Sequence, residues 1–223
     1  MSSIQPSTFP PHTLTIEPYK QEQGLPSIGN YIIGHFDEDS IVVYQAYSPE
    51  IAEYAVKHQR FGGDAFSFSR MSWIKTSFAW MQYRSGWNTK SRQERTLAIK
   101  MKRAGFDSIV ANAVGSKYVQ EIHGTKENFE QLKTSGEVRL QWDPDYVPAL
   151  TPQRLQRRAI QLGLRGETLR RYATEWVISI EDITPFVVEM RERLRRDPSG
   201  TTLWMPIQRV YESYNNDVNH TPS

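Results

Sequence analysis

Cationic and hydroxyl side chains alternate with large aromatic residues over residues 71–87. Three of the six tryptophans lie in this segment, and its polar members include Lys75, Thr76, Ser77, Tyr83 and Arg84. Ammonium and guanidinium groups bind phosphate, whereas indole and phenol rings stack on planar groups. The segment therefore predicts a site for a phosphorylated ligand, with Lys75 and Arg84 on phosphate and Trp80 or Tyr83 against a ring.

Two local structures are compatible with this segment. Trp73, Trp80 and Trp87 are spaced by seven residues, which would stack them along one side of a continuous helix. The alternative is a strand ending at Lys75 and a helix over 78–86 capped by Ser77 or Thr76. We favour the second, because Ser and Thr stabilise a helix start more than a helix interior. The free amides after Ser77 would then form an anion site.

Arg84 has two equally weighted interpretations. Its guanidinium can stack structurally on the neighbouring tryptophans, or it can clamp a pyrophosphate.

Two residues elsewhere in the chain are candidates for catalysis. His123 precedes a predicted helix and is the one histidine placed like a general base, although loop hydrogen bonding is the usual role of such a residue. Asp143 ends a predicted strand, where a carboxylate can hold a ribose hydroxyl or stabilise positive charge, or can simply form a turn. The five histidines lack metal-ligand spacing, so no metal is expected. The phosphate-loop, dinucleotide and hydrolase signatures are missing.

Charge is distributed unevenly along the chain, although the net charge is only +2. Residues 70–103 carry nine Lys and Arg against Glu94 alone, and residues 154–171 carry six Arg against Glu167. Such clusters attract nucleotides or nucleic acid, although a solvated basic face is the ordinary explanation. The absence of cysteine excludes disulfides and thiolate chemistry. Neither a membrane-spanning run nor a signal peptide is recognisable, so we expect a cytoplasmic protein without membrane contact.

Strand and helix signals alternate irregularly between two polar ends. Residues 41–47 are β-branched and aromatic, as in a strand, and Ser48-Pro49 starts a helix that runs to about His58. Further strands are predicted over 96–101, 138–142, 159–164 and 177–180, and further helices begin at Asp107, at Thr125, after Gly166 and at Thr184. This order predicts an α+β fold with a bent or split mixed sheet and flanking helices.

Domain organisation follows from composition. Residues 1–30 are rich in Pro, Ser, Gln and Gly, which predicts a flexible tail, and residues 211–223 suggest a second one. Residues 31–210 would then form a single α+β domain. The oligomeric state is not predicted.

Several motifs resemble the family catalogued as domain of unknown function 4291 over about residues 30–200. They are Tyr44-Gln45-Ala46-Tyr47-Ser48-Pro49, the block from Trp73 to Trp87, and Gln141-Trp142-Asp143-Pro144. This resemblance implies membership of a family and no particular reaction.

The order of elements also resembles ADP-ribosyltransferase-like folds, more faintly. Ser77, with Thr76, matches their Ser-Thr-Ser position, and Asp143 resembles the acid of their Gln-x-Glu motif. Gln45 stands at the position where those folds have a cofactor-binding Arg or His. Glutamine cannot supply the positive charge of that residue, so Arg70, Lys75 or Arg84 would have to supply it. The resemblance implies NAD as cofactor and transfer of ADP-ribose to an acceptor that it does not specify.

Three hypotheses follow. The leading one is a nucleotide-binding enzyme in which Ser77 orients the nicotinamide ribose and Asp143 stabilises positive charge at that ribose. The alternative is an RNA- or single-strand-binding module that uses the same basic and aromatic residues without chemistry. In the third, the tryptophans form core and the arginines are ordinary surface residues.

Overall fold

Strands of two to twelve residues and seven helices form the regular structure in the part of the chain that the computed structural model describes, residues 6–212. The strands are β1 (Ile16–Pro18), β2 (Ile28–Asn30), β3 (Ile33–Phe36), β4 (Ser40–Tyr47), β5 (Ser72–Lys75), β6 (Arg95–Lys102), β7 (Ala113–Val114), β8 (Val138–Val147), β9 (Gln153–Leu164), β10 (Val177–Asp182), β11 (Trp204–Pro206) and β12 (Arg209–Val210). The helices are α1 (Pro49–His58), α2 (Phe78–Ser85), α3 (Arg103–Ala111), α4 (Gln120–His123), α5 (Lys126–Ser135), α6 (Gly166–Arg171), which continues as a π-helical turn over Tyr172–Trp176, and α7 (Thr184–Arg196).

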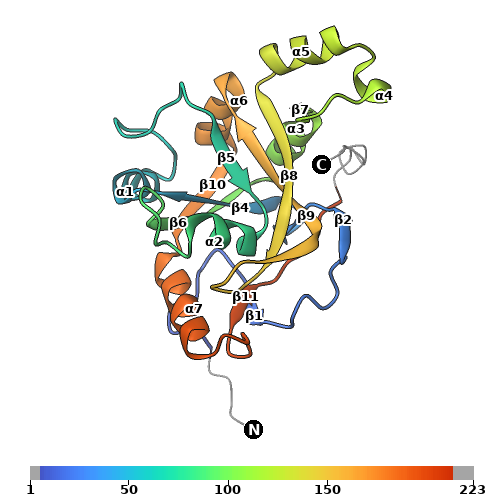
Figure 1. Cartoon of the computed structure of the whole chain (residues 1–223). Coiled ribbons are helices and arrows are strands. Elements are labelled where there is room, and N and C mark those ends of the chain that lie inside the picture. The colour runs from blue at the N-terminus through green and yellow to red at the C-terminus, as the bar shows by residue number, and fades with distance from the viewer. Residues whose placement is uncertain (1–5, 213–223) are drawn as a thin grey trace.

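The main sheet is mixed and strongly bent (Figure 1). Its path runs β10-β6-β4-β5-β9-β8-β7, with β3, β12 and β2 attached at its sides, and most neighbours are antiparallel. The long β8–β9 hairpin crosses the middle of the molecule, while β1 and β11 form a separate pair near α7. The predicted α+β class, with a bent mixed sheet and flanking helices, is confirmed.

Alternating side chains of β4 enter two different cores. Ile41 and Val43 pack with residues of α1, α3 and α6, whereas Val42 and Tyr44 pack with α2, α7 and β11. Because successive side chains of a strand point to opposite faces, β4 is covered by helices on both sides. This burial on both faces fixes the position of the C-terminal end of β4, residues 45–47.

One edge of β4 is only partly paired. Along its other edge β4 pairs with β6 from Ser40 to Tyr47. On the open edge it pairs with β3 at its start and with β5 only at Tyr44–Lys75, after which β4 and β5 diverge. The sheet is therefore split beside residues 45–47 of β4, and this split forms the cleft described below.

The segment 71–87 folds as a strand followed by a helix, as we favoured. Lys75 ends β5, and Ser77 caps α2 by accepting a hydrogen bond from the amide of Trp80 at 3.2 Å. Gly86 closes α2 in the left-handed conformation, at φ 61°, which a glycine adopts without strain. The continuous helix that would have stacked Trp73, Trp80 and Trp87 does not form.

The N-terminal segment differs from the predicted tail. Within residues 6–30, β1 pairs with β11, β2 pairs with β9, and Leu14 is buried against α7 and β11. The Pro- and Gln-rich composition suggested a flexible tail. These contacts could not be predicted locally, because their partners lie far along the chain. Tyr211, at the start of the second predicted tail, is also buried. Residues 1–5 and 213–223 lie outside the described residues.

One helix start was predicted incorrectly. We expected Asp107 to cap a helix, but α3 begins at Arg103, directly after β6. Asp107 lies inside α3, where its carboxylate accepts a hydrogen bond from the Tyr211 hydroxyl at 2.7 Å.

The longest described helix, α7, has 13 residues, and none of the helices within residues 6–212 has the length and apolarity to cross a membrane.

Candidate functional site

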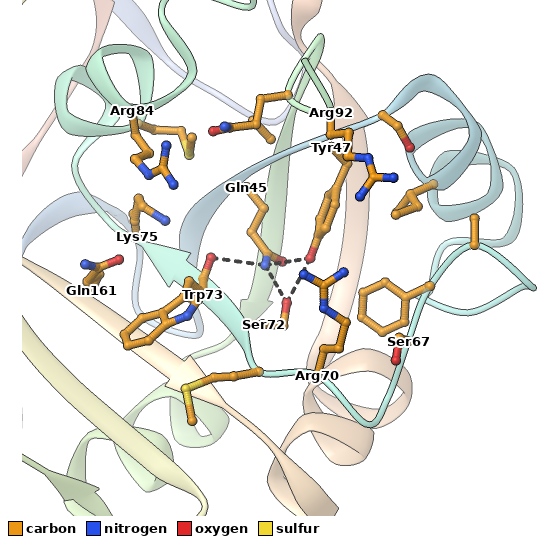
Figure 2. Close-up of a pocket in the computed structure, with 18 of the residues that line it drawn as sticks. Gln45, Tyr47, Ser67, Arg70, Ser72, Trp73, Lys75, Arg84, Arg92 and Gln161 are labelled. Carbon is orange, nitrogen blue, oxygen red and sulfur yellow. Dashed lines mark hydrogen bonds between the residues drawn. The ribbon is translucent and has the colours of Figure 1, made fainter. Parts of the chain in front are cut away.

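A cleft of about 920 Å³ opens where β4 and β5 separate (Figure 2). Its floor comes from the ends of these two strands, and its walls come from the loop before β5, from α2, from the connection between α2 and β6, and from the middle of the β8–β9 hairpin. The volume is typical of a site for a small organic ligand.

Four cationic side chains line the cleft: Arg70, Lys75, Arg84 and Arg92. The single acidic residue of the lining is Glu50, which is exposed. Within residues 6–212, none of the four cations has a carboxylate within 4.0 Å or donates a side-chain hydrogen bond. This part of the chain also holds no cluster of His, Asp and Glu that can bind a metal ion. The lining therefore suits an anion.

Lys75 is the most deeply placed of these cations. It is 6% exposed, and its ammonium lies over the Trp80 ring, 5.0 Å from the ring centre, in a cation–π contact. Burial and, to a smaller extent, the charge of Arg84 lower the pKa of Lys75 to about 7, and Asp143 acts in the opposite direction. Lys75 is thus a desolvated amine without a carboxylate within 4.0 Å among residues 6–212.

Gln45 closes the floor of the cleft across the split in the sheet. Its amide nitrogen lies within hydrogen-bond distance of three oxygens, the backbone carbonyl of Trp73 at 3.1 Å, the Ser72 hydroxyl at 2.9 Å and the Tyr47 hydroxyl at 2.8 Å, as the dashed lines of Figure 2 show. The Tyr172 hydroxyl donates to the Gln45 carbonyl at 2.8 Å. The Gln45 side chain thus replaces the backbone hydrogen bonds that β4 and β5 cannot make where they diverge. These hydrogen bonds hold the uncharged floor of the cleft in one conformation.

A row of polar side chains crosses the sheet from Lys75. Lys75 faces Gln161 on β9, and Gln161 faces Gln141 on β8, so all three share one side of the sheet. The Gln161 amide donates to Gln141 at 2.8 Å and to the carboxylate of Asp143. Burial raises the pKa of Asp143, while the Gln161 hydrogen bond and the charge of Lys75 lower it. Asp143 therefore contacts the lining residue Gln161 and does not itself line the cleft.

The indole of Trp73 forms an apolar wall, and Gly163 makes space for it. A β-carbon on Gly163 would lie 2.9 Å from the Trp73 ring and 2.6 Å from the sulfur of Met71. Both distances are shorter than van der Waals contact, so the ring can lie across β9 only because this residue is glycine.

We expect Gly163→Ala to displace Trp73 and Met71, with a loss of about 1 kcal/mol in the free energy of unfolding, since these side chains can move. The difference in fluorescence between a protein and its Trp73→Phe counterpart isolates the emission of the Trp73 indole. This difference should change between the unsubstituted protein and Gly163→Ala. Adding Met71→Ala to Gly163→Ala should restore the original Trp73 emission in part. An unchanged Trp73 emission spectrum would contradict the close contact.

The structure brings three of the nine predicted site residues into the lining of the cleft and leaves six outside it. Gln45, Lys75 and Arg84 line it. Trp80 is buried beneath Lys75, and Thr76 is buried with its carbonyl accepting from Gln208. Tyr83 stacks on Tyr146 with ring centres 3.6 Å apart. The predicted stacking roles of Trp80 and Tyr83 in the cleft are therefore not supported by their positions.

Ser77 has a structural contact in place of the expected ligand contact. Its hydroxyl donates to Asp145 at 2.9 Å, and Asp145 forms a buried ion pair with Arg157. The Ser77 hydroxyl, one part of the predicted anion site at the start of α2, is thus engaged by a carboxylate of the protein itself. Sequence reasoning failed here because Asp145 lies 68 residues away in the chain.

His123 lies at the end of α4, in the part of the molecule formed by α4 and α5 (Figure 1). It is buried against Phe129, and its ring nitrogen hydrogen-bonds the backbone of Val119. It does not line the cleft, so its position supports the loop role rather than the role of a general base.

Sequence reasoning missed several lining residues. Arg92 belongs to the basic stretch but was not singled out, and Arg70 was considered only as a substitute charge. Phe66, Ser72 and Trp73 also line the cleft. The clustering of Arg70 and Arg92 around the aromatic segment was the available signal, whereas nothing local indicates Phe66.

Comparison with known proteins assigns the chain to a family. No curated protein matches this chain. A family model described as a domain of unknown function (DUF4291) matches residues 31–211, which include every residue that lines the cleft. The chain therefore belongs to the DUF4291 family.

Proposed function

We propose that the chain is a nucleotide-binding enzyme whose ligand, NAD or a related nucleotide, occupies the cleft between β4 and β5. The observation that carries this proposal is the set of four cations around a cleft of ligand size, none of which is paired with a carboxylate of residues 6–212. A cation that is buried without a counter-ion, as Lys75 would be when protonated, is unfavourable, and a phosphate in the cleft would supply the missing charge.

Lys75 and Arg84 are the proposed phosphate contacts. Arg84 presents a guanidinium that can hold two phosphate oxygens at once, and Lys75 offers a point charge from the floor. A bound phosphate would favour the protonated amine and raise the pKa of Lys75 from about 7. Ligand binding near pH 8 should therefore be accompanied by proton uptake.

Trp73 and Phe66 would contact the planar ring of the nucleotide, in the roles first given to Trp80 and Tyr83. Asp143 would stabilise positive charge at the ribose once the Gln161 amide turns aside. In ADP-ribosyl transfer the bond from the ribose carbon to nicotinamide breaks and its electron pair remains on nicotinamide. The acceptor then donates a lone pair to the ribose carbon and releases its proton to solvent.

The test is calorimetric titration and thermal shift with NAD, ADP-ribose and ATP. We expect saturable binding of at least one of them, and an affinity about tenfold lower in Arg84→Gln, because one charged contact contributes about 1.5–3 kcal/mol. Arg60→Gln is the matched control, since Arg60 is exposed and does not line the cleft. Asp143→Asn should retain binding and lose turnover. If none of the three nucleotides binds, the proposal is wrong.

Nucleic-acid binding remains the rival hypothesis, and the structure bears on its stacking component. Trp80 and Trp87 are 5% and 4% exposed, so these indoles are not available to stack on an open strand. Affinity for short RNA that falls steeply with salt, and that Arg84→Gln does not change, would favour this rival.

A further inference from the structure

The four cations of the cleft fall into two groups at opposite ends of β5. Lys75 ends the strand, and Arg84 on α2 is near enough for its charge to lower the pKa of Lys75. Arg70 precedes the start of the strand, and Arg92 lies between α2 and β6. Figure 2 shows Lys75 and Arg84 on one side of Gln45, and Arg70 and Arg92 on the other.

The two groups are separated along the chain by an extended segment. Five residues at about 3.3 Å each place the α-carbons of Arg70 and Lys75 up to about 17 Å apart. Both side chains line the same cleft.

Uncharged groups occupy the space between the two ends. Gln45, Tyr47 and Ser72 hydrogen-bond one another there, and both ends of the Gln45 amide already have partners. The middle of the cleft therefore offers neutral surface, with Trp73 beside it. A single compact anion can neutralise one end of the cleft, and the cations at the other end then remain without a counter-charge.

We propose that the cleft selects a nucleotide with two separate phosphate groups, one bound by Lys75 and Arg84 and the other by Arg70 and Arg92. This inference rests on the proposed nucleotide binding and narrows the ligand to those nucleotides related to NAD that carry a second phosphate apart from the first, which NAD itself does not. The sugar would span the neutral middle, and the base would lie beside it against Trp73. Two adjacent phosphates, as in a nucleoside diphosphate or the pyrophosphate of NAD, would fill one end only.

The experiment compares adenosine 3′,5′-bisphosphate with ADP and with AMP by calorimetric titration at one ionic strength. ADP is the matched ligand, because it has the same number of phosphates in adjacent positions. We expect the bisphosphate to bind at least tenfold more tightly than ADP. Arg70→Gln should remove that advantage by weakening the bisphosphate more than it weakens ADP or AMP, whereas Arg84→Gln should weaken binding of all three ligands. Arg60→Gln should change none of them.

Each outcome separates this inference from the proposed function. Equal binding of ADP and the bisphosphate overturns the two-phosphate inference and leaves nucleotide binding intact. An advantage of the bisphosphate that survives in both Arg70→Gln and Arg92→Gln also overturns it. If none of these ligands, NAD or ATP binds to a protein whose unfolding remains cooperative, both proposals are wrong. Melting curves of each variant confirm that the fold is retained, which we expect because Arg70, Arg84 and Arg92 are exposed.

Discussion

Replacing Arg157 with methionine should lower the free energy of unfolding by about 3–5 kcal/mol. The side chain of Arg157 is 4% exposed and donates to Asp145, which is 2% exposed, at 2.7 Å. It also pairs with Glu22 and donates to the carbonyl of Pro26 at 3.4 Å. Methionine fills similar space, but it leaves the carboxylate of Asp145 buried with the Ser77 hydroxyl as its remaining side-chain partner among the described residues.

Urea unfolding at neutral pH measures this loss. The double variant Arg157→Met with Asp145→Asn is the control, because it removes the carboxylate that the first substitution leaves unpaired. The double variant should recover at least about half of the loss, since the penalty comes mainly from the isolated charge. If the two single effects simply add, the buried charge is not the cause.

Replacing Lys75 with methionine should instead stabilise the protein around pH 7. Burial holds the pKa of Lys75 at about 7, against 10.5 for an ordinary lysine. Between these values the unfolded chain binds a proton that the folded chain does not bind, so the free energy of unfolding of the unsubstituted protein rises with pH in this window. Each pKa unit corresponds to about 1.4 kcal/mol, which makes the full effect on the order of 5 kcal/mol.

The comparison that isolates Lys75 is the difference in unfolding free energy between the two proteins at pH 7, 8, 9 and 10. Lys75→Met should be the more stable protein at pH 7, and the difference should shrink toward zero near pH 10.5. Lys90→Met is the control, because Lys90 is exposed and should give a nearly constant difference. Parallel pH curves for Lys75→Met and the unsubstituted protein would show that this amine is not desolvated.

The fold was most predictable where the signals are local. The strand, cap and helix over residues 71–86 follow from Ser77 as a cap and Gly86 as a terminator, and the structure has both. Strands β1, β2, β3 and β12 were missed, because each has two to four residues and depends on a partner distant in sequence.

The site was predictable in its charges and less so in its aromatic residues. Lys75 and Arg84 are separated by one strand end and two turns of helix, so local structure brings them into the same cleft. The directions of Trp80 and Tyr83 depend on how α2 packs on β8, where Tyr146 stacks on Tyr83. That contact joins residues 63 positions apart, and no local pattern reports it.

The pairing of Glu22 with Arg157 bears on how the protein is divided for experiments. The family match begins at residue 31, so a recombinant fragment cut at that boundary would lack Glu22, β1, β2 and the buried Leu14. Such a fragment would deprive Arg157 of one of its two carboxylates and uncover apolar surface on β11. Expression clones that keep the residues from 6 onward preserve these contacts. Low solubility or low stability of a shorter clone would result from the missing N-terminal contacts and not from the chemistry of the cleft.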